Sequence, residues 1–446
     1  MTPRTPPVSK PPDPTLDFER RTYRRVTRRL IPYLFLCYLF AYVDRVNVSF
    51  AKLQMQHDLG FSDVAYGTAA GIFFIGYFFF EVPANMMLRK IGAKYWLGPI
   101  MIVWGLVSAS TLLVKTDTQF YMVRFLLGVV ESGFFPGVIL YLTFWYTGRD
   151  RAKMVAGFMA AIPISGLVGS PISGWILDAM SSAGGLRGWQ WLYIMEAIPS
   201  VVAGIFTMIF LASTPRDAKW LNDDERKLLL DRLEQDEGGK EALGGRHRLV
   251  DAFRSGKVWL LCLVYFGFVM SNYGITFWLP TLFKHTLTTD PLKIGLLTMI
   301  PWGAAAITMV LVGRHSDKTG ERSWHIATVA VVGAIAFALS AIPGIPGVLG
   351  LILLTIAISG ILTAASSFWT LPTAFLSGAA AGAGIAWINS VGNLGGFLSP
   401  FLVGELTSVF HNMTPALLML GFCSIVAAAI TVIFFRRRPP SAPPMK

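Results

Sequence analysis

Four charged residues lie within otherwise apolar segments of the chain, and they are the residues best placed to do chemistry. Asp44 and Arg45 are adjacent in LFAYVDRVNVSFA (39–51), and Arg124 and Glu131 are seven residues apart in RFLLGVVESGFFPG (124–137). A charged side chain within the hydrocarbon region of a membrane costs about 2.5–3.5 kcal/mol on insertion scales, so four unpaired charges would cost on the order of 10 kcal/mol. We therefore expect them to face one another or a water-filled cavity.

The spacing of the four residues decides which of them can share a helix face. Arg124 and Glu131 would be separated by about 20° around a helix axis and by about 10 Å along it. One face of that helix therefore presents a base and an acid at different depths. Asp44 and Arg45 would point about 100° apart, so they cannot aim at the same spot.

The two residue types suit different tasks. An arginine keeps its proton and can hold a carboxylate through two parallel hydrogen bonds. A carboxyl group in a low-dielectric site can instead gain and lose a proton. The four residues together predict a site for an organic anion and for protons. Structural ion pairing alone is the alternative, and we disfavour it because an inert buried pair costs stability.

Membrane-spanning helices must hold these side chains. The 446 residues are 54% hydrophobic and only 14% charged, whereas soluble domains are about 25% charged. A spanning helix needs about 20 mostly apolar residues. The first 29 residues are rich in Pro and Arg, so we expect no cleavable signal peptide. Twelve segments qualify as spans: 30–50, 66–88, 95–114, 119–146, 153–177, 190–212, 257–283, 294–312, 325–343, 348–371, 380–407 and 412–435.

The net charge of +12 is unevenly distributed and does not indicate nucleic-acid binding. Of the 38 lysines and arginines, 31 fall on the side that holds both termini and the central loop, and five fall on the other side. Positive residues concentrate on the cytoplasmic side of membrane proteins, so we expect both termini there. Only Arg45 and Arg124 remain within spans. The three cysteines lie on separate spans, so we expect no disulfide and no metal or cofactor site.

The longest internal polar stretch divides the twelve spans into six and six. Within it, NDDERKLLLDRLEQDE (222–237) has Asn222 as a candidate N-cap and Glu225 three residues later, which predicts a helix. We favour a tether over a regulatory role for this helix. The predicted organisation is an N-terminal cytoplasmic tail (1–29), a first six-helix bundle (30–212), a linker with an amphipathic helix (213–256), a second six-helix bundle (257–435) and a C-terminal cytoplasmic tail (436–446).

The two halves repeat at a constant offset of 228 residues, which pairs NMMLRKIGAK (85–94) with GRHSDKTGER (313–322). A parallel six-helix repeat is typical of major facilitator transporters, which hold substrate at mid-membrane between the halves. The second copy resembles the short cytoplasmic-loop motif of the major facilitator superfamily. The first copy has Arg89 where that motif has an acid. Asn272 stands at the same offset from Asp44, so the second half keeps a polar residue there without the charge.

A closer resemblance is to the anion:cation symporter family, whose members include tartrate, sugar-acid and hydroxyphenylacetate permeases and the sialic-acid and vesicular glutamate transporters. It rests on AYVDRVNVSFA, YFFFEVPAN (77–85), RFLLGVVESGFFPG and FWTLPTAFLSGAAAGAGIAWINSVGNLGGF (368–397), and covers essentially all of the predicted membrane region. It implies an all-α membrane protein of the major facilitator fold, in which two six-helix bundles alternate access to one cavity.

The resemblance also implies roles for individual residues. Arg45 and Arg124 would contact the substrate anion, and Asp44 and Glu131 would carry the coupled protons. Whether Asp44 titrates or only pairs with an arginine stays open. Ser and Asn also hold membrane helices together, so each neutral polar residue has a packing alternative. The neutral residues expected to complete the cavity are Tyr42, Tyr77, Ser366, Trp369 and Asn389, with Asn393 on the same helix face as Asn389.

Other positions carry weaker expectations. The sugar-acid carriers that the chain resembles have a polar amide where Ile162 stands, which favours a less hydroxylated or partly aromatic acid. Glu81 is expected to be a gate or packing residue rather than a proton carrier. Glu196 and Glu405 are placed near outer span ends, within reach of water, and are assigned no transport role. GLVGSPISG (166–174) resembles a motif of drug antiporters, although close packing of a bent helix is the preferred interpretation.

These observations predict a monomeric, multi-pass, proton-coupled symporter of a bacterial inner membrane, surrounded by lipid. It would import a small organic carboxylate anion, and a sugar acid, a dicarboxylate and an aromatic acid all remain open. The alternative in the same fold is a proton-coupled antiporter that exports a drug or metabolite. A sensor would need a signalling domain, for which tails of 29 and 11 residues leave no room. An enzyme is not expected, because no nucleophile-base or metal-ligand arrangement accompanies the four charges.

Overall fold

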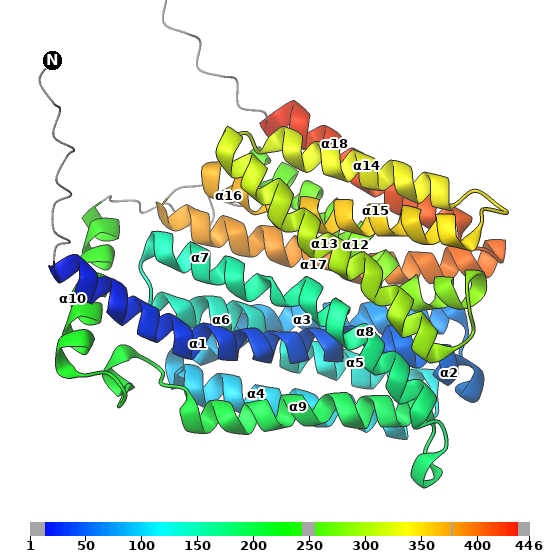
Figure 1. The fold of residues 1–446 in the computed structure, drawn as a ribbon, viewed down its shortest axis with the longest axis horizontal. Helices are drawn as coiled ribbons and strands as arrows, with labels where there is room; N and C mark the ends of the chain where they lie inside the picture. Colours follow the sequence, from blue (N-terminus) through cyan, green and yellow to red (C-terminus); the bar gives the residue numbers. More distant parts are fainter. Residues whose placement is uncertain (1–13, 243–254, 376–377, 436–446) are drawn as a thin grey trace, which may run out of the picture.

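The computed structural model describes residues 14–242, 255–375 and 378–435, and the regular elements within these ranges are all helices (Figure 1). The predicted tail 436–446 lies outside the described residues. The helices of the first half are α1 (Pro14–Val46), α2 (Val48–Leu59), α3 (Asp63–Ile91), α4 (Ala93–Ser110), α5 (Asp117–Glu131), α6 (Phe134–Thr143), α7 (Gly148–Met159), α8 (Ala161–Ala179) and α9 (Gly188–Phe210). Helix α10 (Asp223–Ala242) lies in the linker. The second half comprises α12 (Gly256–Thr286), α13 (Pro291–Thr319), α14 (Ser323–Ser340), α15 (Gly347–Phe368), α16 (Thr370–Phe375), α17 (Gly378–Phe410) and α18 (Thr414–Phe435).

Eleven helical stretches in the described part of the chain are long and apolar enough to cross a membrane. They correspond to the predicted spans with one exception, 380–407, which falls within α17, a helix of 33 residues. At a rise of 1.5 Å per residue, a helix of this length extends about 50 Å. The helical content and the spans therefore agree with the all-α membrane fold that the sequence predicts.

The linker helix α10 lies across one end of the molecule, beside the start of α1 (Figure 1). Its predicted cap is present, because Glu225 N donates to Asn222 Oδ1 (2.7 Å) and Asn222 N donates to Glu225 Oε2 (3.1 Å). Two ion pairs attach it to α1, Arg25 to Glu225 at 2.9 Å and Arg232 to Glu19 at 2.6 Å. These contacts hold the first turns of α1, which lie within the segment predicted to be a tail, against α10. We call this the linker end, and the opposite end, which holds the α2–α3 turn, the distal end.

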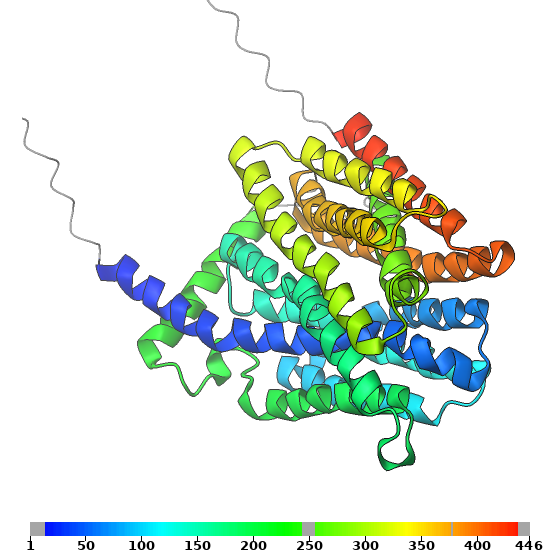
Figure 2. The same ribbon diagram turned by 45° about the vertical axis from the view of Figure 1, so that its right-hand side comes forward.

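Helices pack with one another within each half, and α2 packs on α12 as one of three helix pairs that join the halves. Helix α4 packs on α9 and α3 on α5 in the first half, and α14 packs on α15 and α18 in the second. Across the halves α8 packs on α13 and α3 on α17 (Figures 1 and 2). A Cβ at Gly174 of α8 would lie 2.5 Å from Pro291 O and 3.0 Å from Gly295 Cα. Glycine thus permits the close contact of α8 with α13, and the GLVGSPISG stretch serves helix packing here.

The helices are interrupted close to the predicted functional residues. Asn47 separates α1 from α2 two residues after Arg45, and α5 ends at Glu131 itself. Trp369 separates α15 from α16. The backbone nevertheless keeps right-handed helical dihedral angles at Asn47 and Trp369, and Asn47 N donates to Val43 O at 2.9 Å. These interruptions are therefore local changes within continuous spanning stretches.

Candidate functional site

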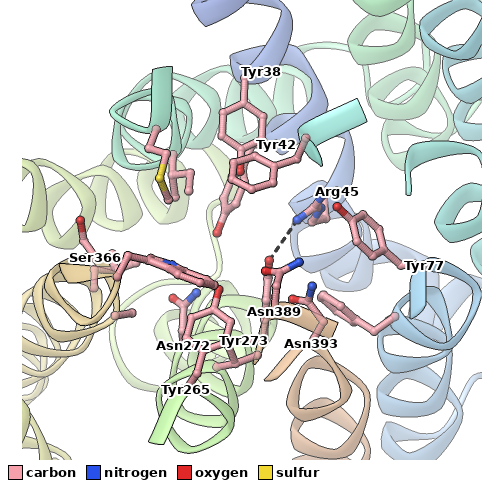
Figure 3. Close-up of a pocket in the computed structure, with 18 of the residues that line it drawn as sticks. Tyr38, Tyr42, Arg45, Tyr77, Tyr265, Asn272, Tyr273, Ser366, Asn389 and Asn393 are labelled. Carbon is pink, nitrogen blue, oxygen red and sulfur yellow. Dashed lines mark hydrogen bonds between the residues drawn. The ribbon is translucent and has the colours of Figure 1, made fainter. Parts of the chain in front are cut away.

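A cavity of about 100 Å³ lies between the two halves, near the middle of the helices (Figure 3). The volume is enough for several water molecules or a small ligand. Helices of both halves line it, so a relative movement of the halves changes its access. The lining residues of the first half are Tyr38, Tyr42, Arg45, Phe74, Tyr77, Phe135, Met159 and Ile162, and those of the second half are Tyr265, Val269, Asn272, Tyr273, Met309, Leu362, Ala365, Ser366, Trp369, Asn389 and Asn393.

Arg45 provides the positive charge of the cavity wall and is only 7% exposed. Its Nε donates to Glu131 Oε1 at 3.0 Å, its Nη2 also contacts that oxygen, and its Nη1 donates to Tyr273 OH at 3.1 Å (Figure 3). The guanidinium lies over the rings of Phe73 and Tyr77, at 5.2 and 5.6 Å from their centroids. Buried charges need such pairing because desolvation is costly. Glu131 Oε2 has no hydrogen-bond partner among the described residues.

Arg124 is buried in the first half and does not line the cavity. Its Nε donates to Ala69 O at 3.3 Å, and its two terminal nitrogens have no partner among the described residues. The ring of Phe73 lies 5.2 Å from the guanidinium of Arg124 and 5.2 Å from that of Arg45, and thus lies close to both. From the sequence, Arg45 and Arg124 were both predicted to contact one substrate anion. The two turns of helix between Arg124 and Glu131 place Arg124 farther toward the distal end.

Asp44 points away from the cavity, into the first half, and is fully buried. It accepts hydrogen bonds from Trp104 Nε1 (3.1 Å), Ser108 Oγ (3.3 Å) and Ser200 Oγ. The described residues include no ion pair of Asp44 with an arginine and no hydrogen bond between Asp44 and Glu131. Of the two alternatives left open for Asp44, pairing with an arginine is not seen in this conformation, and whether Asp44 titrates stays a prediction. The roughly 100° between adjacent side chains on α1 turns Asp44 toward α4 and α9.

The structure brings the predicted neutral residues together. Tyr42, Tyr77, Ser366, Trp369, Asn389 and Asn393 all line the cavity with Arg45. Sequence reasoning did not select Tyr38 or Tyr265. The signal for Tyr38 was available, because it precedes Tyr42 by four residues and Arg45 by seven, which places all three on one helix face.

One side of the cavity is apolar. Phe135, Met159, Ile162, Met309 and Leu362 line it, whereas Arg45, the tyrosines and the asparagines supply the polar groups. Ile162 stands at the position where an amide was expected from the resemblance, and it does face the cavity. A bound carboxylate that meets Arg45 would place its remaining atoms against partly apolar walls.

Contacts between the halves are present on both sides of the cavity. On the distal side Tyr66 OH donates to Phe277 O (2.8 Å), and Lys52 Nζ lies 3.2 Å from the centroid of Trp278 while it pairs with Asp63 Oδ1 (2.9 Å). On the linker side Glu81 accepts from Asn389 Nδ2 (2.9 Å) and from Ser390 Oγ (3.2 Å). Glu81 therefore lies where a gate or packing residue was expected.

Glu196 was predicted to lie within reach of water, and this prediction is wrong. It is 6% exposed and accepts a hydrogen bond from Ser173 Oγ at 2.6 Å. Glu196 lies close in sequence to the outer end of its predicted span, which suggested that water reaches its carboxyl group. The packing of α9 against α8 and α2 covers it instead.

Comparisons with known proteins agree with this architecture. The profile of the Major Facilitator Superfamily matches residues 34–400. Similar curated proteins include the putative metabolite transport protein NicT of Pseudomonas putida, at 44% identity over 92% of this chain and 93% of that protein, and a putative tartrate transporter of Agrobacterium vitis, at 42% over 94% and 92%. A quinolone resistance transporter of Acinetobacter baumannii is 38% identical over 93% and 95%. A bacterial homologue of the human lysosomal transporter Spinster, in an inward-facing and occupied conformation, shares the fold at a TM-score of 0.74 with 13% identity, over 92% of this chain and 98% of that one.

Proposed function

The chain belongs to the major facilitator superfamily of membrane transporters, and from that premise we propose that it is a proton-coupled symporter of small organic carboxylates. The observation that carries the proposal is the buried ion pair between Arg45 and Glu131 at the cavity between the halves. A carboxylate entering the cavity meets a guanidinium whose charge is already balanced by Glu131. Anion and proton must therefore bind together.

Charge balance links the two ligands. In the empty carrier Arg45 and Glu131 sum to zero. When Glu131 takes up a proton its charge disappears, and Arg45 becomes free to bind a substrate carboxylate through parallel hydrogen bonds. The loaded site is again neutral. A proton alone or an anion alone leaves a net charge in a low-dielectric site, which is costly, so these partly loaded forms cross slowly between the two orientations.

The other predicted residues fit supporting tasks. Arg124 adds a second fixed positive charge near Phe73, which raises the potential felt by an approaching anion. Tyr42, Tyr77, Ser366, Trp369, Asn389 and Asn393 offer neutral hydrogen-bonding groups and a stacking surface. Asp44 would bind a further proton away from the substrate. The apolar side around Ile162 favours an acid with few hydroxyls, and the similarity to proteins named as tartrate and metabolite transporters supports a small organic anion.

The same proposal includes the sidedness of the protein. The linker end would face the cytoplasm of a bacterium and the distal end the outside of its inner membrane, in accord with the distribution of Lys and Arg. A single chain contains both halves of the cavity, so a monomer surrounded by lipid is a complete carrier.

Uptake into proteoliposomes tests the proposed function. The purified chain would be reconstituted with an alkaline interior and offered labelled tartrate, a sugar acid and 4-hydroxyphenylacetate in separate experiments. We expect at least one acid to accumulate above its outside concentration and to leak out when an uncoupler collapses the gradient. Liposomes without protein are the control. Absence of gradient-driven uptake for all members of a broad acid panel would overturn symport of carboxylates.

A proton-coupled antiporter that exports a drug or metabolite is the second candidate, because one similar protein is named as a quinolone resistance transporter. The two arginines disfavour a cationic cargo on charge grounds. Proton-driven movement of a hydrophobic dye cation in the opposite direction to the proton, with no response to carboxylates, would favour the antiporter.

A further inference from the structure

Glu196 is a buried carboxyl group that the mechanism above does not use. It lies on α9, one helical turn on the distal side of Ser200. Ser173 Oγ of α8 donates to its Oε1 at 2.6 Å, its Oε2 has no hydrogen-bond partner among the described residues, and the amide of Asn47 lies beside it. An ionised carboxylate buried in this way without a cation is costly. The neutral acid is therefore the less costly form in this conformation.

The titratable groups around Glu196 are few. Asp44 faces it from α1, and Tyr193 lies one turn away on α9 itself. Helix α8 contributes the Ser173 hydroxyl, and α2 carries Lys52, whose Nζ is held by Asp63 and Trp278 instead. No ion pair of Glu196 occurs among the described residues. Asp44 and Glu196 are thus two buried carboxyl groups of the first half, and neither has an ion pair among the described residues.

A small cavity of about 20 Å³ is also lined by Ser173, and it lies between α1, α2, α8, α12 and α13. One water molecule needs roughly 10–15 Å³ of such space, so the cavity can hold about one. Its polar lining comprises Ser49, Ser165, Ser170, Ser173, Thr276 and Thr298. Ser173 therefore contacts both Glu196 and this cavity. The cavity lies where α8 and α13 join the two halves, so separation of the halves at the distal end would open it to solution.

We propose that Glu196 shares with Asp44 the further proton assigned to it above, distinct from the proton of Glu131, and exchanges this proton with the distal side through the Ser173 cavity. Taking up a proton from water converts the Glu196 carboxylate to the neutral acid, and returning it to water restores the carboxylate. No other bond changes. The inference rests on the proposed proton coupling and assigns a second site to it.

The steady-state accumulation ratio tests this assignment, because it reports the number of coupled protons rather than the transport rate. Across a gradient of one pH unit at zero membrane potential, each coupled proton contributes about a tenfold accumulation. We expect Glu196→Gln to lower the ratio of the transported acid by about that factor while exchange of internal for external acid continues. Glu405→Gln, which alters a partly exposed glutamate of α17, is the matched control and should leave the ratio unchanged. An unchanged ratio in Glu196→Gln would refute the assignment.

Infrared difference spectroscopy gives a readout that needs no substrate. A pH titration of the wild-type protein in lipid should show carbonyl bands of buried carboxylic acids, and Glu196→Gln should lack one of these bands while Glu405→Gln keeps them all. If Glu196→Gln fails to fold, Ser173→Ala and Glu196→Asp replace it, and we expect a shifted titration of the band and partial retention of the ratio, respectively. Identical titrations in the wild type and Ser173→Ala would contradict the role of the Ser173 cavity.

The two proposals fail in different ways. If the wild-type protein shows no gradient-driven uptake, the proposed function is wrong, whatever the spectra show. If the wild-type protein accumulates acid and Glu196→Gln matches it in both ratio and spectrum, only the second proton site is wrong.

Discussion

Arg45 and Tyr273 occupy equivalent positions in the two halves of the chain, 228 residues apart, and they meet across the cavity in a hydrogen bond of 3.1 Å. The equivalent helices α1 and α12 therefore contact each other through polar side chains at the cavity. In the first half this position carries the charge that a carboxylate needs, and in the second half it carries a neutral hydroxyl. The repeat has thus placed a charged group and a neutral hydroxyl on opposite walls of one cavity.

Glu131 is expected to couple the proton to the substrate. Glu131→Gln keeps the size of the side chain but removes its negative charge and its ability to bind a proton. We expect gradient-driven accumulation to be abolished, while exchange of labelled for unlabelled acid continues, because Arg45 stays free to bind a carboxylate. Both activities would be measured in the same proteoliposomes. Equal loss of accumulation and exchange would remove the coupling role.

Arg45 and Arg124 should differ in their effect on stability. Removing one partner of a buried ion pair costs about 3–5 kcal/mol, so Arg45→Met, which leaves Glu131 unpaired, should lower the melting temperature. Arg124 has no acidic partner among the described residues, and Arg124→Met should leave the melting temperature unchanged or higher. The stabilisation by a transported acid should disappear in Arg45→Met and weaken in Arg124→Met, because Arg124 lies outside the cavity. Thermal denaturation with and without the acid checks this, and equal destabilisation by the two substitutions would contradict it.

Tyr66 should stabilise closure of the distal end. Its hydroxyl donates to Phe277 O across the halves at 2.8 Å. A net hydrogen bond of about 1 kcal/mol corresponds to a change of about fivefold in the equilibrium between conformations. Tyr66→Phe should raise the population open at the distal end by that factor, as measured by distances between spin labels on α2 and α12. Tyr95→Phe, at an exposed tyrosine, is the control, and the same distance distribution in Tyr66→Phe and the wild type would argue against the contact.

Glu81 should stabilise closure of the other end of the cavity, the linker end. It accepts hydrogen bonds from Asn389 and Ser390 on the linker side, and hydrogen bonds to charged groups contribute about 1.5–3 kcal/mol. Glu81→Gln should therefore favour opening at the linker end, seen as faster labelling of a cysteine introduced into the cavity from that side. If labelling instead becomes faster from the distal side, the assignment of Glu81 to linker-side closure fails.

Ile162 should influence which acid is preferred. It lines the apolar side of the cavity, and one hydrophobic group typically contributes a discrimination of about tenfold or more. Ile162→Gln should weaken inhibition by 4-hydroxyphenylacetate more than inhibition by a sugar acid. Each acid would compete with the labelled acid that the wild-type protein takes up. Competition curves for both acids check this, and Ile172→Gln, at an exposed position of α8, is the control. Parallel changes for both acids would exclude a role in selectivity.

The sequence by itself determined the membrane fold and most of the cavity. Long apolar segments and the 228-residue repeat require spanning helices in two halves, because a chain in lipid must satisfy its backbone hydrogen bonds internally. The cost of buried charge singled out Arg45, Glu131, Arg124 and Asp44. Helical spacing also predicted that Asp44 and Arg45 would point in different directions.

Only the tertiary structure decided which partner each charge has. The packing of neighbouring helices, rather than spacing along one helix, pairs Arg45 with Glu131. It also places Asp44 beside Trp104 and Ser200. Arg124 lies outside the cavity for the same reason. The same is true of Glu196, whose distance from a span end suggested water but whose surroundings are Ser173 and Asn47. The burial of a side chain depends on which side chains of other helices pack against it. The spacing of residues along one helix does not specify these neighbours.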